Sequence, residues 1–269
     1  MKDPQDRPME PRSAAAPVLE AIGISQRFGG ALAVDRVSIA VGRGQIAGLI
    51  GPNGAGKTTL FDILAGDRQP TAGVVRLQGQ PVQGESAAMR LGRGLGRTFQ
   101  IPRPFAELTV VENVMLGCQR HPGESVWANW FAGGRVARAE RETYERAVEL
   151  LEFVTLAPLA REPARVLSGG QRKLLELARV LLAKPAIVLL DEPAAGVHPA
   201  LLETIAARIA ALNAAGMTFL IIEHNLDLIA RLCRHVYVMA EGRLLCEGLP
   251  DDVVRDARVV EAYVGGRAA

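Results

Sequence analysis

The chain has 269 residues, of which 49% are hydrophobic and 22% are charged, a composition typical of an ordinary soluble globular protein with a sizeable core. Its 31 basic residues are balanced by 29 acidic ones without a long block of one sign, which argues against nucleic acid as a partner. The 3 cysteines are scattered and form no C-x-x-C pair, so they indicate neither a disulfide framework nor a zinc site and suit the reducing cytosol.

The first segment, residues 1–17, is predicted to be a disordered tail. It is rich in proline and charged residues and lacks the apolar stretch of a signal peptide. No later apolar run approaches the roughly 20 residues that a membrane-spanning helix requires. If the protein works at a membrane, we therefore expect another chain to cross it.

From residue 18 to about residue 79, short apolar runs separated by glycine-bearing turns predict mainly strands. One helix is predicted in this part, over Thr58 to Ala65, and Gly66 ends it. The predicted strands are Val18 to Ile24, Val34 to Val41, Gln45 to Ile50 and Val74 to Leu77.

Between the third of these strands and the helix, residues 51–59 fit the pattern G-x-x-x-x-G-K-[ST] in the strand–loop–helix context that the pattern needs. The glycines let successive N–H groups turn inward as an anion cradle at a helix N-terminus. The basic side chain would reach the β- and γ-phosphates, and the first hydroxyl would bind Mg²⁺. The alternative is a glycine-rich structural turn. The loop is Gly51, Pro52, Asn53, Gly54, Ala55, Gly56, Lys57, Thr58 and Thr59.

Between about Leu91 and Leu167 the pattern becomes helical. Thr109 to Leu116 begins with an N-cap-like Thr and a Glu three residues later, and Ala137 to Phe153 is amphipathic. Within this region, residues 123–134 hold both tryptophans, Trp127 and Trp130, which either pack the loop onto the helices or contact a partner; packing is the favoured reading.

From Ser168 onward, helices and buried strands alternate, so the helical region is predicted to be an insertion into a parallel sheet. The predicted strands are Ile187 to Leu190, Thr218 to Ile222 and Val236 to Met239.

The strand beginning at Ile187 ends in two carboxylates, Asp191 and Glu192, as a central strand does when its C-terminal end opens on a nucleotide crevice. Asp191 would belong to the Mg²⁺ shell. Glu192 would polarise an attacking water, a role that needs an acceptor within hydrogen-bond reach. The alternative is a strand end with two solvated acids.

The segment Leu167 to Gln171 precedes an amphipathic helix over Arg172 to Ala183. Ser168 is a natural N-cap and Gln171 completes a capping box, so one reading is simply a well-capped helix. Gly169 and Gly170 also leave bare N–H groups at the helix mouth, which makes a second anion site.

The phosphate loop, the segment at 167–171 and the strand at 187–192, in this order, resemble the ATP-binding cassette (ABC) ATPases, over about residues 18–265. The resemblance implies an α/β P-loop NTPase fold, with a mostly parallel core sheet, an antiparallel β subdomain and an inserted helical subdomain at about 92–171. Residues 18–269 would form a single ATP-binding domain that ends in a helical extension at about 250–266.

In that family two cassettes pair head to tail, and each ATP, with Mg²⁺, lies between one subunit's phosphate loop and the other's signature helix. Ser168 and Gly170 would then serve the partner's γ-phosphate. The resemblance further places Phe28 on the adenine ring, Gln100 on Mg²⁺ and water, and His224 on the γ-phosphate. Without it, a lone Gln means nothing, a lone His is more often structural, and Phe28 is also compatible with a core position.

The chain departs from the family at residues 194–199, where many cassettes have Ser-Ala-Leu-Asp and this sequence lacks the aspartate. Any role for an acid from this turn across the dimer interface is therefore in doubt. The turn itself is sound, since Gly196 is followed by Pro199 at the expected start of the next helix.

Four stretches resemble the ATPase subunits of branched-chain amino acid importers: 27–30, 192–196, 222–225 and 259–265. This implies hydrolysis of ATP coupled to transport, at the cytoplasmic face of the inner membrane. The expected partners are a second ATPase subunit, identical or homologous, two transmembrane permease subunits and, indirectly, a substrate-binding protein. Importers of urea or short amides and the lipopolysaccharide exporter remain alternatives. An ABC factor of DNA repair would need a coiled-coil insertion or zinc cysteines, and one of translation would need two cassettes.

Overall fold

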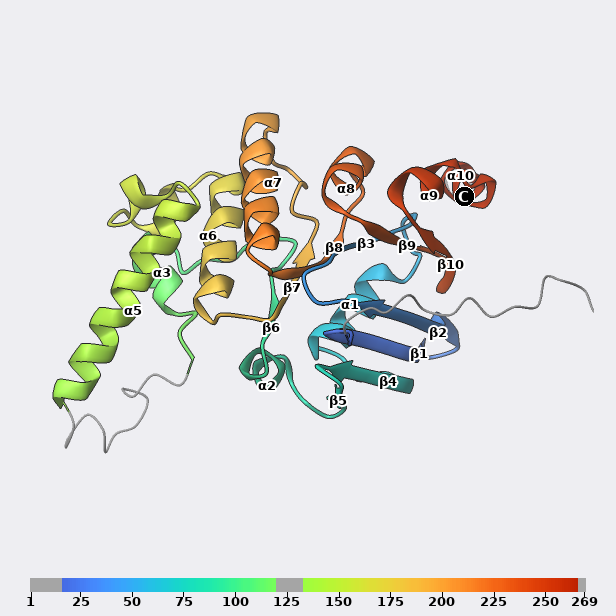
Figure 1. Ribbon diagram of the computed structural model, residues 1–269, viewed down its shortest axis with the longest axis horizontal. Helices are drawn as coiled ribbons and strands as arrows, with labels where there is room; N and C mark the ends of the chain where they lie inside the picture. Colours follow the sequence, from blue (N-terminus) through green and yellow to red (C-terminus); the bar gives the residue numbers. More distant parts are fainter. Residues whose placement is uncertain (1–15, 120–132, 266–269) are drawn as a thin grey trace, which may run out of the picture.

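Two β-sheets organise the protein, whose computed structural model describes residues 16–119 and 133–265 (Figure 1). The larger sheet has the strand order β10-β9-β3-β8-β7-β6 and the smaller has the order β2-β1-β4-β5. The strands are β1 (Leu19–Phe28), β2 (Ala31–Val41), β3 (Ile46–Ile50), β4 (Ala72–Leu77), β5 (Gln80–Pro81), β6 (Leu95–Arg97), β7 (Ile187–Asp191), β8 (Thr218–Ile222), β9 (His235–Ala240) and β10 (Arg243–Gly248).

Most of the other described segments are helical. Those of the α type are α1 (Lys57–Ala65), α2 (Ala87–Gly92), α3 (Val110–Met115), α5 (Gly133–Phe153), α6 (Gly169–Leu182), α7 (Pro199–Ala214), α8 (Leu226–Leu232), α9 (Pro250–Arg255) and α10 (Ala257–Gly265), and short 3-10 turns are η2 (Ala157–Leu159) and η3 (Ala164–Val166). None of the described helices combines the length and the hydropathy that a membrane crossing would need.

The core sheet is parallel except at one edge. Strand β3 pairs in parallel with β8 and β9, and β7 pairs in parallel with β8 and β6, whereas β10 is antiparallel to β9. Every residue of β3, β7 and β8 is buried, which explains their continuous aliphatic sequences: helices including α6 and α7 cover one face of the sheet, and α1 with the smaller sheet covers the other. The predicted parallel core sheet is confirmed.

The smaller sheet is antiparallel, with β1 paired to both β2 and β4. Helix α1 lies between the two sheets (Figure 1), where its fully buried Leu60 and Phe61 join one cluster with Ile24 and Val75 of the small sheet and Leu189 of the core sheet. The phosphate loop before α1 is therefore anchored to both sheets. The α/β fold with an antiparallel β subdomain is as predicted.

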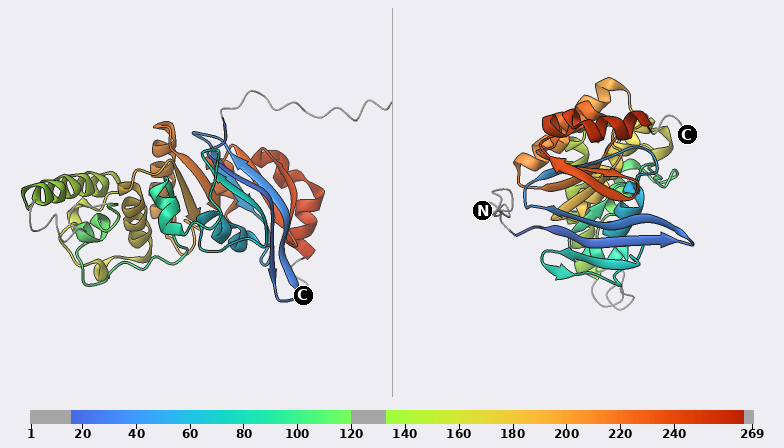
Figure 2. Two further views of the ribbon diagram at one scale, coloured as in Figure 1. Left: turned by 90° about the horizontal axis from the view of Figure 1, so that it is seen from below. Right: turned by 90° about the vertical axis from the view of Figure 1, so that its right-hand side faces the viewer.

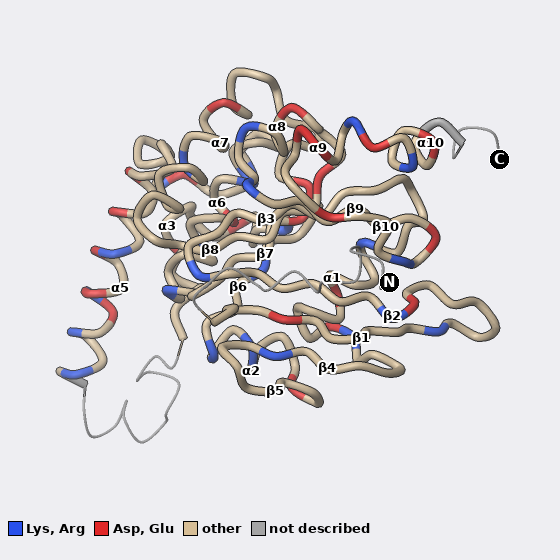
Figure 3. The backbone as a smooth tube through the Cα atoms, turned by 45° about the vertical axis from the view of Figure 1, so that its right-hand side comes forward, with Lys and Arg blue, Asp and Glu red and all other residues tan. Residues whose placement is uncertain are grey.

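At the other end of the molecule, α3, α5 and α6 form a helical lobe (Figure 2, left). Val114 of α3, Leu151 of α5 and Leu174 of α6 are buried together in one cluster. Helix α5 carries Arg and Glu at i,i+3 and i,i+4 spacing on its solvent side, and charges of both signs alternate along it (Figure 3).

The region predicted to be helical from about Leu91 contains a strand of the core sheet, β6, and the prediction was wrong there. Three residues give too short a run for periodicity to reveal. The described end of the chain, α9 and α10, occupies the segment for which a helical extension is predicted. The tail predicted at 1–17, apart from its last residues, and the tryptophan pair lie outside the described residues.

Candidate active site

The phosphate loop follows β3 and needs glycine for its path. Gly51, Gly54 and Gly56 have φ of 149°, 78° and 92°, in the region that residues with a Cβ rarely adopt. A Cβ on Gly51 would collide with the carbonyl oxygen of Met239, and one on Gly56 with that of Ala33. The loop is thus pressed against neighbouring backbone on one side, and its exposed tip, including Gly54, is left for a ligand.

Lys57, the first residue of α1, is only 5% exposed, and its Nζ donates to the carbonyl oxygens of Gly51 at 2.7 Å and Pro52 at 2.9 Å. Burial lowers the pKa of Lys57, and the negative charge of Glu192 opposes that shift. No side chain caps the helix at Gly56, so the free N–H groups and this ammonium group together suit an anion. Thr58 is exposed at the same helix mouth, and Thr59 is half-buried.

Asp191 ends β7 in a buried position, 6% exposed. Its Oδ2 accepts from Arg97 Nη2 at 3.1 Å, and its backbone N–H donates to Thr98 Oγ1 at 3.3 Å. Burial raises the pKa of Asp191, and the hydrogen bond from Arg97 opposes that shift. Arg97 also pairs with Asp62 and Asp67, so one guanidinium holds three carboxylates.

Glu192 is held by Gln100 and His224, the two side chains that the family resemblance places at the Mg²⁺ ion and the γ-phosphate. Its Oε2 accepts from Gln100 Nε2 at 2.6 Å, and its Oε1 lies 2.9 Å from His224 Nε2. Gln100 follows β6, Glu192 follows β7 and His224 follows β8, three adjacent strands of the sheet. Because parallel strands end at the same edge, residues far apart in the sequence meet here.

Glu223, which was not predicted as a site residue, organises the same edge of the sheet. It is 2% exposed, and its carboxylate accepts from the backbone N–H groups of Ala194, His224 and Asn225. It therefore ties the loop after β7 to the loop after β8. An acid directly after an apolar strand was the available signal.

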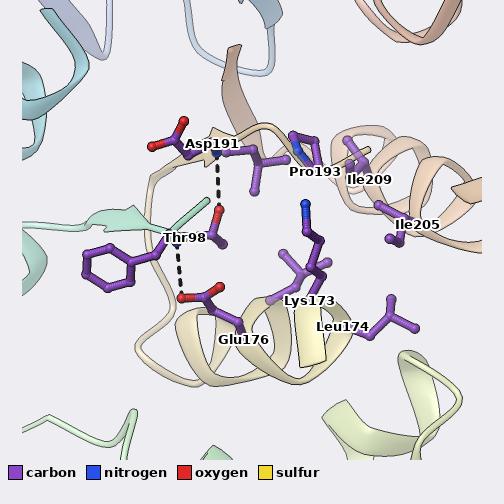
Figure 4. A pocket seen from close by; sticks show the side chains of 11 residues that line it. Thr98, Lys173, Leu174, Glu176, Asp191, Pro193, Ile205 and Ile209 are labelled. Atoms are coloured by element: carbon purple, nitrogen blue, oxygen red, sulfur yellow. Dashed lines mark hydrogen bonds between the residues drawn. The ribbon is translucent and has the colours of Figure 1, made fainter. Parts of the chain in front are cut away.

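Two further side chains that were not predicted as site residues, Lys173 and Glu176, extend from α6 toward the strand ends (Figure 4). Lys173 Nζ donates to the backbone carbonyl of Glu192 at 2.5 Å. Glu176, 4% exposed, accepts from the backbone N–H of Phe99 at 3.1 Å. Burial raises the pKa of Glu176 to about 7, against the opposing effects of that hydrogen bond and of the charge on Arg179. In the sequence, the only sign of these contacts is that Lys173 and Glu176 are three residues apart on one helix.

The mouth of α6 forms the predicted capping box. Ser168 Oγ accepts from the backbone N–H of Gln171 at 3.3 Å, and Gln171 Oε1 accepts from that of Ser168 at 2.9 Å. Ser168 and Gly169 are exposed, whereas a Cβ on Gly170 would collide with Leu201.

Phe28, at the end of β1, is 43% exposed, and the guanidinium carbon of Arg68 lies 4.6 Å from its ring centre. One face of the ring is thus taken by a cation. Farther along the chain, the turn with Gly196 leads to Pro199 at the first position of α7, as predicted, and His198 Nδ1 caps that helix.

Comparison with known proteins decides the family. The family described as "ABC transporter" matches residues 34–195. The chain belongs to the ABC transporter family. A second description, "Branched-chain amino acid ATP-binding cassette transporter", matches residues 243–269 of this ABC cassette.

The cassette is 40% identical over 250 residues to "High-affinity branched-chain amino acid transport ATP-binding protein BraF" of Pseudomonas aeruginosa, with 93% of this chain and 98% of that protein covered. It is 37% identical over 250 residues to the "Probable branched-chain amino acid transport ATP-binding protein LivG" of Archaeoglobus fulgidus, covering 93% and 96%. A solved nucleotide-free ATP-binding cassette from an ABC transporter superposes with TM-score 0.80 at 38% identity, covering 91% of this chain and 98% of that one.

Membership makes ATP hydrolysis the activity of this ABC cassette. Its structure brings Gln100, Glu192 and His224 into one cluster, and the charge of Glu192 acts on Lys57. Helix α6, which begins at Ser168 to Gln171, lies in the helical lobe, away from α1 (Figure 1; Figure 2, left).

Proposed function

We propose that this cassette is the ATP-hydrolysing subunit of a membrane importer for branched-chain or related amino acids. The role in hydrolysis is supported by one observation: Gln100 and His224 each contact one carboxylate oxygen of Glu192, beside the phosphate loop. The transport part is supported by the names of BraF and LivG and by the second family description, which covers the C-terminal helices.

The residues fit ATP at the loop and Mg²⁺ beside it. Lys57 and the uncapped mouth of α1 would bind the phosphates, and Phe28 would offer its ring to the adenine. The described residues contain no group of three His, Cys, Asp or Glu side chains able to hold a metal alone, so the ion would rely on nucleotide oxygens together with Thr58, Gln100 and Asp191. Bound there, it would neutralise phosphate charge.

Glu192 acts in this proposal as the base for water. Its carboxylate accepts a proton as the water oxygen attacks the γ-phosphorus, and the bond from that phosphorus to the β–γ bridging oxygen breaks. Gln100 and His224 fix the orientation of the carboxylate, so the acceptor is aimed before the reaction begins. Lys57 stabilises negative charge on the leaving side.

The signature mouth, Ser168 to Gln171, would complete the site of a second ATPase subunit, identical or homologous. Exposed Gly169 offers an N–H group and exposed Ser168 a hydroxyl, neither of which the chain's own phosphate loop uses, while the Ser168 N–H is held in the capping box. The dimer would sit as a peripheral assembly on the cytoplasmic face of the inner membrane, against two permease subunits fed by a binding protein. ATP would close the dimer and hydrolysis would reopen it.

The test combines the trapped variant with transport. Glu192→Gln should bind ATP, form a stable dimer on size exclusion and release no phosphate at steady state. Cells producing the wild-type chain together with the permeases and binding protein of a branched-chain amino acid importer should accumulate labelled leucine, and cells producing the variant should not. Uptake inhibited by excess urea but not by valine would move the assignment to the urea importers, and lipopolysaccharide export without uptake would overturn import.

A further inference from the structure

We infer that Lys173 and Glu176 are positioning residues through which the signature helix α6 sets the alignment of Glu192 and Gln100 for hydrolysis. The inference rests on the proposed role of Glu192. Neither residue is expected to touch nucleotide, because each grips the main chain of a loop and not a reacting group.

The backbone of Glu192 is where Lys173 acts. Glu192 has φ of 46°, a left-handed conformation that costs energy for any residue with a Cβ and persists only when its surroundings enforce it. Three hydrogen bonds do so: its N–H donates to Ile222 at 3.0 Å, while its carbonyl accepts from Ala195 N at 3.1 Å and from Lys173 Nζ at 2.5 Å. Of these donors and acceptors, only Lys173 belongs to another structural unit, the helical lobe.

Glu176 does the equivalent for the loop after β6. Its carboxylate accepts from the N–H of Phe99, the residue just before Gln100. Gln100 itself is exposed, so its side chain has little packing to fix it. The grip on Phe99 therefore limits the positions from which Gln100 can reach Glu192.

Together these contacts form a closed circuit. Helix α6 holds Glu192 through Lys173 and the loop before Gln100 through Glu176, and the 2.6 Å bond from Gln100 to Glu192 closes it. Figure 4 shows both side chains leaving the same face of the helix, with Asp191, Thr98 and Pro193 on the facing strand ends. A helix is a rigid element, so displacing α6 would disturb both members of the pair at once.

The charges agree with this arrangement. Burial lowers the pKa of Lys173, and the nearby negative charges of Glu223, Glu192, Glu176 and Asp191 oppose that shift. Half-buried Lys173 thus lies among carboxylates and yet donates one hydrogen bond to a neutral group, the backbone carbonyl of Glu192.

The test uses matched pairs in the full-length chain, with steady-state phosphate release measured against ATP concentration. Lys173→Met and Glu176→Leu remove the donor and the acceptor, while Lys173→Arg and Glu176→Gln keep them. We expect kcat to fall about 10- to 100-fold in the first two, as for a displaced catalytic group, with KM changed less than about twofold. The conservative variants should recover most of kcat.

A second measurement separates positioning from folding. In the Glu192→Gln background, Lys173→Met should still give the ATP-trapped dimer, which requires an intact fold and an intact phosphate loop. If Lys173→Met does not yield folded protein, Glu176→Leu and Glu176→Gln supply the same comparison.

The inference is overturned if Lys173→Met and Glu176→Leu keep wild-type kcat, or if the conservative variants lose as much activity as the disruptive ones. If either result is obtained while Glu192→Gln is inactive, only the positioning role of Lys173 and Glu176 is rejected. Continued hydrolysis by Glu192→Gln would instead sink the proposed base, and the inference with it.

Discussion

Gln100 Nε2 donates a 2.6 Å hydrogen bond to Glu192 Oε2 across 92 residues of sequence. This bond exists because β6 and β7 run parallel and end at one edge of the core sheet. The Glu192 carboxylate is therefore oriented by a side chain from a different loop, and replacing either residue should disturb the position of the other.

Gln100→Ala should lower kcat for ATP hydrolysis about 10- to 100-fold, because Glu192 loses one of its two orienting partners. Nucleotide affinity should change little, since Lys57 and the loop are untouched. Phosphate release and binding of a fluorescent ATP analogue measure the two effects. Gln80→Ala, an exposed glutamine of β5, serves as the control, and equal turnover in both variants would contradict the assignment.

Lys57→Ala should weaken ATP binding by about 10- to 100-fold, the cost of about 1.5–3 kcal/mol for losing a hydrogen bond to a charged group. Isothermal titration calorimetry gives the affinity directly. Arg76→Ala, which removes an exposed cation from β4, should bind like the wild type. Undiminished affinity in Lys57→Ala would show that the loop holds phosphate through backbone groups alone.

Ser168→Ala and Thr109→Ala form a matched pair, since both residues begin helices with complete capping boxes. Each substitution should lower the free energy of unfolding by about 1 kcal/mol in urea titrations. Only Ser168→Ala should also weaken ATP-driven dimerisation of the Glu192→Gln chain. Equal dimerisation of both variants would leave Ser168 as a helix cap and nothing more.

Arg97→Met should destabilise the fold by about 3 kcal/mol, because it leaves the carboxylate of Asp191, 6% exposed, without its cation. The double variant with Asp191→Asn should be more stable than the sum of the single changes predicts, since the uncompensated charge is gone. Chemical unfolding of the four proteins in this cycle measures the coupling. Simple additivity would mean that Asp62 and Asp67 account for the role of Arg97.

Glu176→Gln should flatten the dependence of stability on pH. The pKa of Glu176 is about 7 in the fold against 4.5 for the free group, so between these values the folded chain binds more protons than the unfolded one. Stability from this group is therefore greatest at the acid end and declines as pH rises from 4.5 to about 7. Unfolding free energies of wild type and variant across that window should diverge by a few kcal/mol. Parallel curves would refute the shift.

Patterns confined to short stretches were predictable from the sequence. Three features depend on interactions within about ten consecutive residues, and the structure contains all three: the phosphate loop, the capping box at Ser168 and the aliphatic strand before Asp191. Gln100 and His224 were proposed only through the family resemblance, because a single polar residue after a strand has no pattern of its own.

The supporting contacts could not be predicted because they join distant elements. Arg97 with Asp191, and Lys173 with Glu192, depend on how strands and helices are placed in space, and no spacing in the chain encodes that. Strand β6 was not predicted for a different reason. Its three residues form a strand because they pair with β7, and their own sequence has no strand pattern.

Helix α6 begins at the mouth formed by Ser168 to Gln171, and farther along it carries Lys173 and Glu176, which hold the loops after β7 and β6. In an assembly of two identical subunits, every copy would then influence both nucleotides, its own through Lys173 and its neighbour's through Ser168. A variant chain with a defective α6, produced together with normal chains, would therefore impair every dimer that contains it. Such a variant would be dominant negative.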